Sequence, residues 1–151
     1  MQPFKTPSAV IVLLVRQSAG KKQVLLQRRR NTGFADGMWD FSCSGKVEEG
    51  ESMIQTAVRE AREELGVRFS PHKLEFLCLV HKRDKQFNIV FYNSYFLCSD
   101  FDGEPTICEA EKCSELKWFD LDDLPDDLID DRRQALKAYL GGKHYLEYGW
   151  Q

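Results

Sequence analysis

The stretch that decides the fold runs from Gly45 to Val67 and reads GKVEEGESMIQTAVREAREELGV. Its second half has the start and stop signals of a helix. Ser52 can N-cap the helix and Gln55 can complete a capping box, while Gly66 is placed to end it. One apolar stripe is predicted from spacings of three and four, formed by Ile54, Val58, Ala61 and Leu65. We therefore predict a helix between Ser52 and Gly66, preceded by a glycine loop.

Six glutamates lie in this stretch, and three of them (Glu60, Glu63 and Glu64) fall within five residues. Composition alone favours a solvated helix face with ion pairs such as Arg59 with Glu63. The spacing i, i+3 and i+4 instead places the three carboxylates on one face of the helix. Like charges one turn apart destabilise a helix by a few tenths of a kcal/mol, roughly, unless they hold a cation. Clustered carboxylates are typical ligands of Mg²⁺, which also accepts water and phosphate oxygens.

The rest of the chain alternates strands with helices. Apolar, β-branched runs predict strands at Ser8–Val15, Gln23–Arg28, Leu74–His81 and Asn88–Cys98, with shorter strands in WDFS and LKWF. A second helix is expected from Pro125 to Gly141, and the aromatic tail KHYLEYGW is expected to pack on the body. We predict a single domain over residues 1–151 in the α/β (α+β) class, an α/β/α sandwich with a mixed β-sheet between helices.

Composition and charge exclude several classes of function. The net charge of −3 and an acidic region of thirteen Asp/Glu over residues 100–131 argue against binding a nucleic-acid polymer. The apolar run AVIVLLV is too short to span a membrane, so no membrane association is expected. Five cysteines without CxxC spacing favour reduced thiols rather than disulfides or zinc. The expected location is therefore the cytoplasm.

The same stretch resembles the signature of the Nudix hydrolase family, G-x5-E-x7-R-E-U-x-E-E-x-G-U, where U is a bulky apolar residue. Gly45, Glu51, Arg59-Glu60, Glu63-Glu64 and Gly66-Val67 match it, and Ala61 is smaller than usual at its apolar position. The NTG-x-x-DG run before it resembles the MutT-like nucleotide pyrophosphohydrolases. The Ser42-Cys43-Ser44 run replaces the Pro-Gly or Pro-Ala pair that precedes the glycine in many members.

The resemblance implies a set of functional residues. Glu60, Glu63 and Glu64, with the carbonyl of Gly45, are the expected ligands of Mg²⁺, with Mn²⁺ as an alternative ion. Glu51 and Arg59 are expected to form an ion pair that orients the helix and loop. A glutamate from a later loop often assists the chemistry in this family, and among Glu104, Glu109 and Glu111 we favour Glu111.

Candidate substrate contacts lie in RRRNTGFADGMWD. Arg28 and Arg29 are candidates for phosphate contact, although a solvated basic turn is equally compatible with the sequence. Phe34 and Trp39 could stack on a base, but Trp39 could instead be a core residue. Asp40 could accept hydrogen bonds from a base edge.

The expected reaction is Mg²⁺-dependent hydrolysis of a nucleoside diphosphate linked to X. For a nucleoside triphosphate the products would be the monophosphate and pyrophosphate. ADP-ribose or a nucleotide sugar is an alternative substrate, and a catalytically silent nucleotide-binding module is an alternative class. An isopentenyl-diphosphate isomerase is disfavoured because the signature is intact, although Cys43 lies beside it. The expected partner is a small nucleotide, bound by a monomer or a homodimer.

Overall fold

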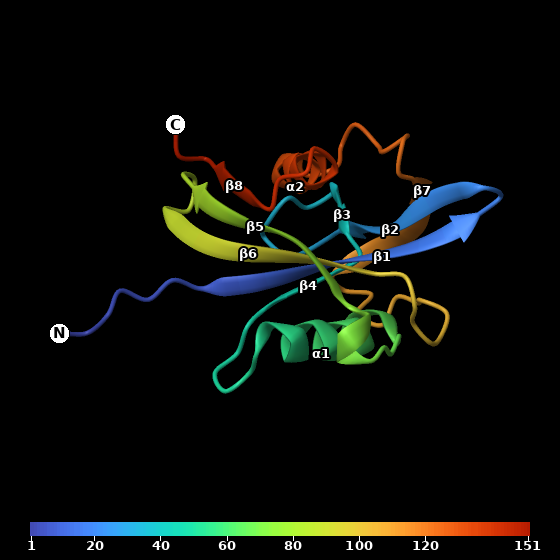
Figure 1. The fold of residues 1–151 in the computed structure, drawn as a ribbon, viewed down its shortest axis with the longest axis horizontal. Coiled ribbons are helices and arrows are strands. Elements are labelled where there is room, and N and C mark those ends of the chain that lie inside the picture. Colours follow the sequence, from blue (N-terminus) through green and yellow to red (C-terminus); the bar gives the residue numbers. More distant parts are fainter.

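The computed structural model describes residues 1–151 as a mixed β-sheet covered by one long helix on each side, as Figure 1 shows. The strands are β1 (Ser8–Ser18), β2 (Lys21–Arg29), β3 (Trp39–Phe41), β4 (Cys43–Lys46), β5 (Glu75–Asp84), β6 (Ile89–Cys98), β7 (Cys113–Asp120) and β8 (Tyr145–Tyr148). The helices are α1 (Met53–Leu65), the short 3-10 helix η1 (Pro71–Lys73) and α2 (Asp130–Leu140). This architecture confirms the predicted α/β/α sandwich.

The sheet is organised around β1. Its strand order is β3-β2-β1-β6-β5-β8, with β4 paired to β1 and β7 paired to β2. β1 runs parallel to β6, and β5 runs parallel to β8, whereas the other pairs are antiparallel. A central strand with helices over both faces must be apolar on both sides. The uninterrupted run from Val10 to Val15 satisfies this requirement.

The alternation of side chains along β1 divides the core into two clusters. Ile11, Leu13 and Val15 belong to the cluster under α2. Val10 and Val12, with Leu14, belong to the cluster that packs on α1. α1 and α2 therefore lie on opposite faces of the same strand. A ligand that contacts both faces must lie across an edge of the sheet.

Three elements differ from the sequence predictions. Gly45 and Lys46, expected to belong to the glycine loop, are part of β4 (Cys43–Lys46), because this backbone pairs with β1 from Ala9 to Val12. α2 begins at Asp130 and not at Pro125, because residues 126–127 form a turn and Leu128 pairs with Trp39. The C-terminal tail contacts the body as expected, but it does so as β8.

The predicted stripe on α1 is wrong at its first position. Ile54 is 39% exposed, whereas Ala57, Ala61 and Leu65 are buried, with Thr56 beside them. The helix is rotated so that small residues face the sheet, and Val58 packs only at the border of the cluster. Small side chains allow α1 to lie close to β1 and β4.

Candidate active site

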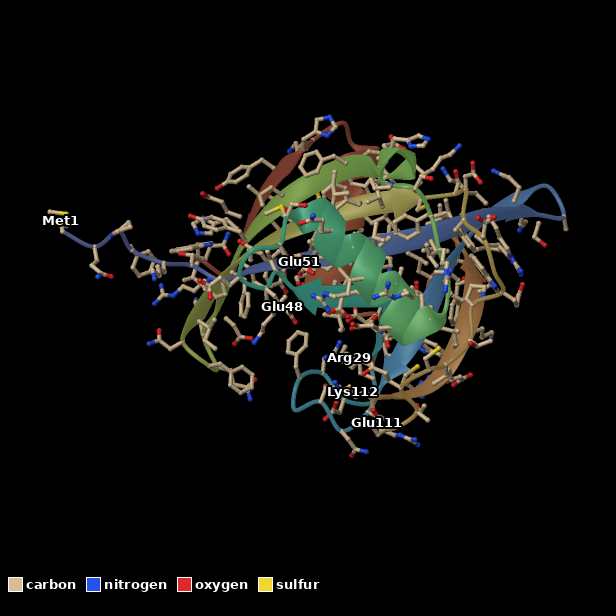
Figure 2. All side chains as sticks on the ribbon, turned by 90° about the horizontal axis from the view of Figure 1, so that it is seen from below. Met1, Arg29, Glu48, Glu51, Glu111 and Lys112 are labelled. Atoms are coloured by element: carbon tan, nitrogen blue, oxygen red, sulfur yellow. The ribbon has the colours of Figure 1, made fainter.

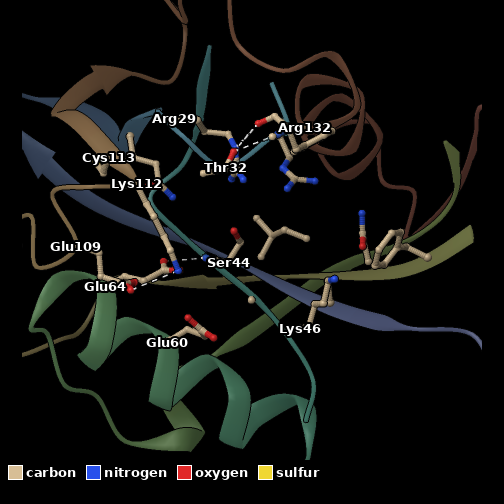
Figure 3. A pocket seen from close by; sticks show the side chains of 18 of the residues that line it. Arg29, Thr32, Ser44, Lys46, Glu60, Glu64, Glu109, Lys112, Cys113 and Arg132 are labelled. Carbon is tan, nitrogen blue, oxygen red and sulfur yellow. Dashed lines mark hydrogen bonds and ion pairs between the residues drawn. The ribbon is translucent and has the colours of Figure 1, made fainter. Parts of the chain in front are cut away.

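One large cavity of about 750 Å³ opens at the edge strand β4. It is bounded by α1 on one face of the sheet, by the loop that follows β2, and by the β5–β6 hairpin and the start of α2 on the other face. Figure 3 shows Glu60 and Glu64 rising from α1 on one side, with Arg29 and Arg132 on the opposite side. The cavity is therefore acidic at the helix and basic across from it.

Contacts between residues close in the sequence fix the two ends of α1. The Ser52 side chain accepts a hydrogen bond from the Gln55 amide, and the Gln55 side chain accepts one from the Ser52 amide, so the predicted capping box is present. Gly66 ends the helix at φ 71°, a left-handed conformation that favours glycine. These caps determine which turn of the helix carries Glu60 and Glu64.

Gly45 brings β4 into direct contact with the glutamates. A Cβ atom on Gly45 would collide with the Glu60 carboxylate. Only glycine therefore lets this carboxylate lie against the β4 backbone, where a main-chain carbonyl and a side-chain carboxylate are close together.

The Arg59 guanidinium pairs with several glutamates on and beside α1. Its Nε donates to Glu51 Oε2 at 2.7 Å, and its Nη1 donates to Glu60 Oε1 at 2.8 Å and to Glu63 Oε2 at 3.3 Å. The hydrogen bonds from Arg59 and Thr56 lower the pKa of Glu51 to about 2. The structure therefore contains the Glu51–Arg59 pair that the sequence predicted, and this pair ties the glycine loop to α1.

Glu64 lies deepest among the glutamates. Its Oε2 accepts a hydrogen bond from the Ser44 amide at 3.2 Å. Burial, followed by the negative charge of Glu60, raises the pKa of Glu64 to about 9. A carboxyl group in this environment is destabilised as an anion unless a cation is bound beside it.

The donor set fits a hard divalent cation, although no three acidic, histidine or cysteine side chains converge on one point in this structure. Arg59 holds Glu60 and Glu63, and Glu63 remains half exposed. Glu60 and Glu64 share one face, with Gly45 against Glu60. A cation held by these oxygens would relieve the charge repulsion at Glu64.

The three candidate glutamates of the loop before β7 differ in whether they line the cavity. Glu109 lines the cavity, and its charge contributes to the raised pKa of Glu64. Glu111, the residue that we favoured, is exposed and does not line the cavity; Figure 2 shows it at the outer side of the loop. Glu104 also lies outside the cavity lining. Of these three glutamates only Glu109 lines the cavity, while Asn31 Nδ2 and Arg30 Nη2 donate to the carbonyls of residues 111 and 110 and hold that part of the loop away.

The five candidate substrate residues divide into two groups. Arg29 and Phe34 line the cavity, with the Arg29 guanidinium 5.2 Å from the centre of the Phe34 ring. Arg28, Trp39 and Asp40 do not line the cavity. Trp39 is 3% exposed and packs edge-on against Phe119 in the core, which corrects the stacking hypothesis.

Asp40 is a structural counter-ion and does not face a base. It is 0% exposed, and it accepts hydrogen bonds from Arg29 Nη1 at 2.9 Å and Arg132 Nε at 2.8 Å. Burial acts to raise the pKa of Asp40, but the charges of Arg132 and Arg29 outweigh it and hold the pKa below its usual value. Arg28 instead lies over the Trp39 ring, outside the cavity.

Several polar residues of the cavity were missed from the sequence, among them Lys82, Asn93, Lys112 and Arg132. Asn93 lies inside the largely apolar strand β6, which is a signal that a polar side chain faces a cavity, whereas Lys82 lies in the polar end of β5, where its sequence gives no such signal. Arg132 lay inside the predicted second helix, and only the packing of α2 reveals that it reaches the site.

Cys43 is fully buried in the α1 cluster. Burial, together with the nearby Glu64 and Glu60 charges, raises the pKa of the Cys43 thiol well above its usual value. A thiol that resists ionisation is a packing residue, and this environment is unsuited to the acid–base role of an isomerase cysteine.

Comparison with known proteins agrees with this geometry. The family model of the NUDIX domain matches residues 5–139. The uncharacterized Nudix hydrolase YfcD of Salmonella typhi is 28% identical over 135 residues, covering 85% of this chain and 67% of that protein. The chain therefore belongs to the Nudix family, whose members hydrolyse phosphoric anhydride bonds and typically use a divalent metal.

Two solved structures share the fold. A MutT NUDIX hydrolase from Burkholderia pseudomallei is 29% identical with a TM-score of 0.78, covering 89% of this chain and 98% of that chain. The NUDIX domain of Shewanella oneidensis NrtR, solved with ADP ribose, is 26% identical with a TM-score of 0.71, covering 92% of this chain and 90% of that chain. The protein is a MutT-like Nudix hydrolase that acts on nucleotide-like substrates. No helix in it is long and apolar enough to cross a membrane.

Proposed function

We propose that this protein hydrolyses a nucleoside diphosphate linked to X, and specifically a nucleoside triphosphate to its monophosphate and pyrophosphate. The observation that carries the proposal is the two-sided cavity, in which Glu60 and Glu64 face Arg29 and Arg132. Glu60, Glu63, Glu64 and the Gly45 carbonyl would hold Mg²⁺, or Mn²⁺ in its place. The bound ion supplies charge neutralisation at the phosphate oxygens and lowers the pKa of a bound water.

The side chains of this chain account for the remaining chemistry. Arg59 orients Glu60 and is anchored in turn by Glu51. Glu109 is placed on the cavity wall to accept a proton from the attacking water. Lys112 is on the same wall and points inward, where it can pair with phosphate oxygens (Figure 3).

We extend the proposal to the whole chain. Residues 1–151 would act as one domain, as a monomer or a homodimer, without a nucleic-acid polymer as partner. A cytoplasmic location is supported by the five cysteines, all of which are free thiols.

ADP-ribose is the second candidate substrate, with nucleotide sugars beside it. The cavity volume suits a ligand of that size, and the related NrtR domain was solved with ADP ribose. A catalytically silent module is disfavoured by the complete set of glutamates, which a purely binding role would not require.

A panel of nucleoside triphosphates, ADP-ribose and nucleotide sugars, incubated with Mg²⁺, separates these candidates. The products to measure are nucleoside monophosphate, pyrophosphate and orthophosphate. We expect triphosphates to yield monophosphate and pyrophosphate, and Glu64→Gln to abolish turnover while Glu49→Gln, in the exposed loop, leaves it unchanged. Turnover that survives Glu64→Gln, or the absence of turnover on every diphosphate, would refute the proposal.

A further inference from the structure

The last residues of the chain, Tyr145–Gln151, form a segment that we call the C-terminal strap. Its strand β8 is the outermost strand of the sheet and runs parallel to β5 (Figure 1). Beyond β8, Trp150 Nε1 donates to the carbonyl of His81 at 2.9 Å. Gly149 lies so close to β5 that a Cβ atom on it would collide with the Arg83 carbonyl. The strap therefore holds the β5 backbone on both sides of the residue between these two carbonyls.

That residue is Lys82, which is buried and lines the cavity. In the strand register it is flanked by Phe91 of β6 on one side and by Tyr148 of the strap on the other. Tyr148 packs against the core cluster under α2, so its ring and the Lys82 side chain are neighbours on the same face of the sheet. The ring therefore limits the directions that the Lys82 side chain can take.

The hydroxyl of Tyr148 contacts α2. It donates to Asp130 Oδ2 at 2.6 Å, and Asp130 is the first residue of that helix. The next residue, Asp131, lies 3.3 Å from Lys82 Nζ and accepts a hydrogen bond from Arg132 Nη1 at 3.0 Å. Tyr148 thus lies beside β5 through its ring and is bonded to α2 through its hydroxyl, at the point where each element carries a cation of the cavity.

The environment of the Tyr148 hydroxyl keeps it a hydrogen-bond donor. Burial, followed by the hydrogen bond to Asp130, raises the pKa of Tyr148 above its usual value. The phenol therefore retains its proton at neutral pH and can bond to a carboxylate throughout. Hydrogen bonds to an ionised acceptor are stronger than those between neutral groups.

The side of the cavity that this contact supports carries a net positive charge. Three cations and two carboxylates form one connected group, which gives a net charge of +1; the group contains Arg29, Lys82, Arg132, Asp40 and Asp131. We call this group the basic wall. Its cations come from β2, β5 and α2, so its ability to bind an anion depends on how these elements are spaced.

We propose that Tyr148 is a positioning residue that fixes the spacing of Lys82 and Arg132, so that both cations bind the anionic part of the substrate. This inference rests on the proposed function and assigns a role at the same site to a residue outside the cavity. The strap follows residues 5–139, the part of the chain that the NUDIX family model matches, so the family signature does not imply this role.

Tyr148→Phe tests the proposal because it removes the hydroxyl and keeps the ring. Tyr145→Phe is the matched control, since Tyr145 is an exposed residue of the same strand whose hydroxyl donates to Glu147 within the strap. We expect Tyr148→Phe to raise KM for the triphosphate about three- to tenfold, the range of one hydrogen bond, and to leave kcat within about twofold. KM alone changes when a contact binds substrate and transition state equally. Tyr145→Phe should leave both constants unchanged.

A double-mutant cycle with Lys82→Met distinguishes positioning from stabilisation of the strap. This second substitution keeps most of the lysine stem and leaves Arg132 as the partner of Asp131. If Tyr148 acts through Lys82, adding Tyr148→Phe to Lys82→Met should change KM by less than about twofold, because the two effects are coupled. A residue that only stabilised the strap would lower Tm and leave KM unchanged.

Binding is measured separately from hydrolysis, so the two proposals can fail separately. The probes are the non-hydrolysable α,β-methylene analogues of ATP and of ADP-ribose with Mg²⁺, and Kd is measured by calorimetry. Absence of turnover on every diphosphate would refute the proposed function, whereas a Kd that rises about three- to tenfold in Tyr148→Phe and not in Tyr145→Phe would still support the positioning role.

Three results would overturn the inference. The first is an unchanged KM and Kd in a Tyr148→Phe variant whose circular dichroism matches the parent. The second is an increase in KM of the same size with and without Lys82. The third is failure of both analogues to bind the unaltered protein, because the basic wall would then not bind a phosphate ligand.

Discussion

The raised pKa of Glu64 predicts an unusual dependence of metal-free stability on pH. The pKa is about 9 in the folded protein, against an ordinary value of 4.5. Between these two values the folded state binds more protons than the unfolded state, so the free energy of unfolding must fall as pH rises. Each pH unit within the window corresponds to at most about 1.36 kcal/mol.

The size of the effect is measurable between pH 6 and pH 8, both of which lie within this window. Two pH units correspond to an upper limit of about 2.7 kcal/mol, and we expect on the order of 2 kcal/mol because solvent reaches part of the site. For a chain of this length that is a decrease in Tm of about 4–8 °C.

The assay is thermal unfolding in EDTA at pH 6, 7 and 8, followed by circular dichroism. Glu64→Gln should lose the decrease, because a neutral amide replaces the titrating group, whereas Glu49→Gln should keep it. Mg²⁺ should raise Tm more at pH 8 than at pH 6, since the ligand carboxylates must lose their protons to bind it. The same pH dependence in the parent protein and in Glu64→Gln would refute the assignment of this shift to Glu64.

Three further variants test other parts of the site. Gly45→Ala should weaken Mg²⁺ affinity about 10–100-fold, measured by metal titration of turnover, because the new Cβ displaces the Glu60 carboxylate; an unchanged affinity would contradict the role of this glycine. Asp40→Asn removes the buried carboxylate that the half-buried Arg29 and the buried Arg132 share, and leaves Arg132 with Asp131 alone, so it should lower the free energy of unfolding by about 3–5 kcal/mol in urea titrations; a loss below about 1 kcal/mol would show that the pairs are not needed. Glu109→Gln should reduce kcat about 10²–10⁴-fold while Glu111→Gln remains near the parent value; the reverse order would restore our first assignment.

The acidic side of the site was predictable because it is local. Glu60 and Glu64 are one helical turn apart, and helix geometry places such residues on one face in any fold. The capping box and Gly66 set the ends of the helix through contacts within a few residues. The Glu51–Arg59 pair was implied by the resemblance of the same stretch to the Nudix signature.

The basic side was not predictable, because its contacts join distant parts of the chain. The Asp40–Arg132 pair spans 92 residues and depends on the segment that leads into α2, where Leu128 pairs with Trp39 of β3. Trp39 and Asp40 carry residue types common in binding sites, and the packing instead uses both inside the protein. Ile54 shows the same limit, since the rotation of α1 depends on how closely it approaches the sheet.

The amino-acid sequence by itself determined the family, the helix that carries the glutamates, and a central strand that is apolar on both faces. Helix period, strand alternation and caps depend on residues a few positions apart, so they can be deduced without the fold. Only the tertiary structure decided that Glu109 rather than Glu111 faces the cavity, and that Lys82 and Asn93 line it together. These placements depend on the register between strands and on the packing of α2, which bring together side chains that no local pattern connects.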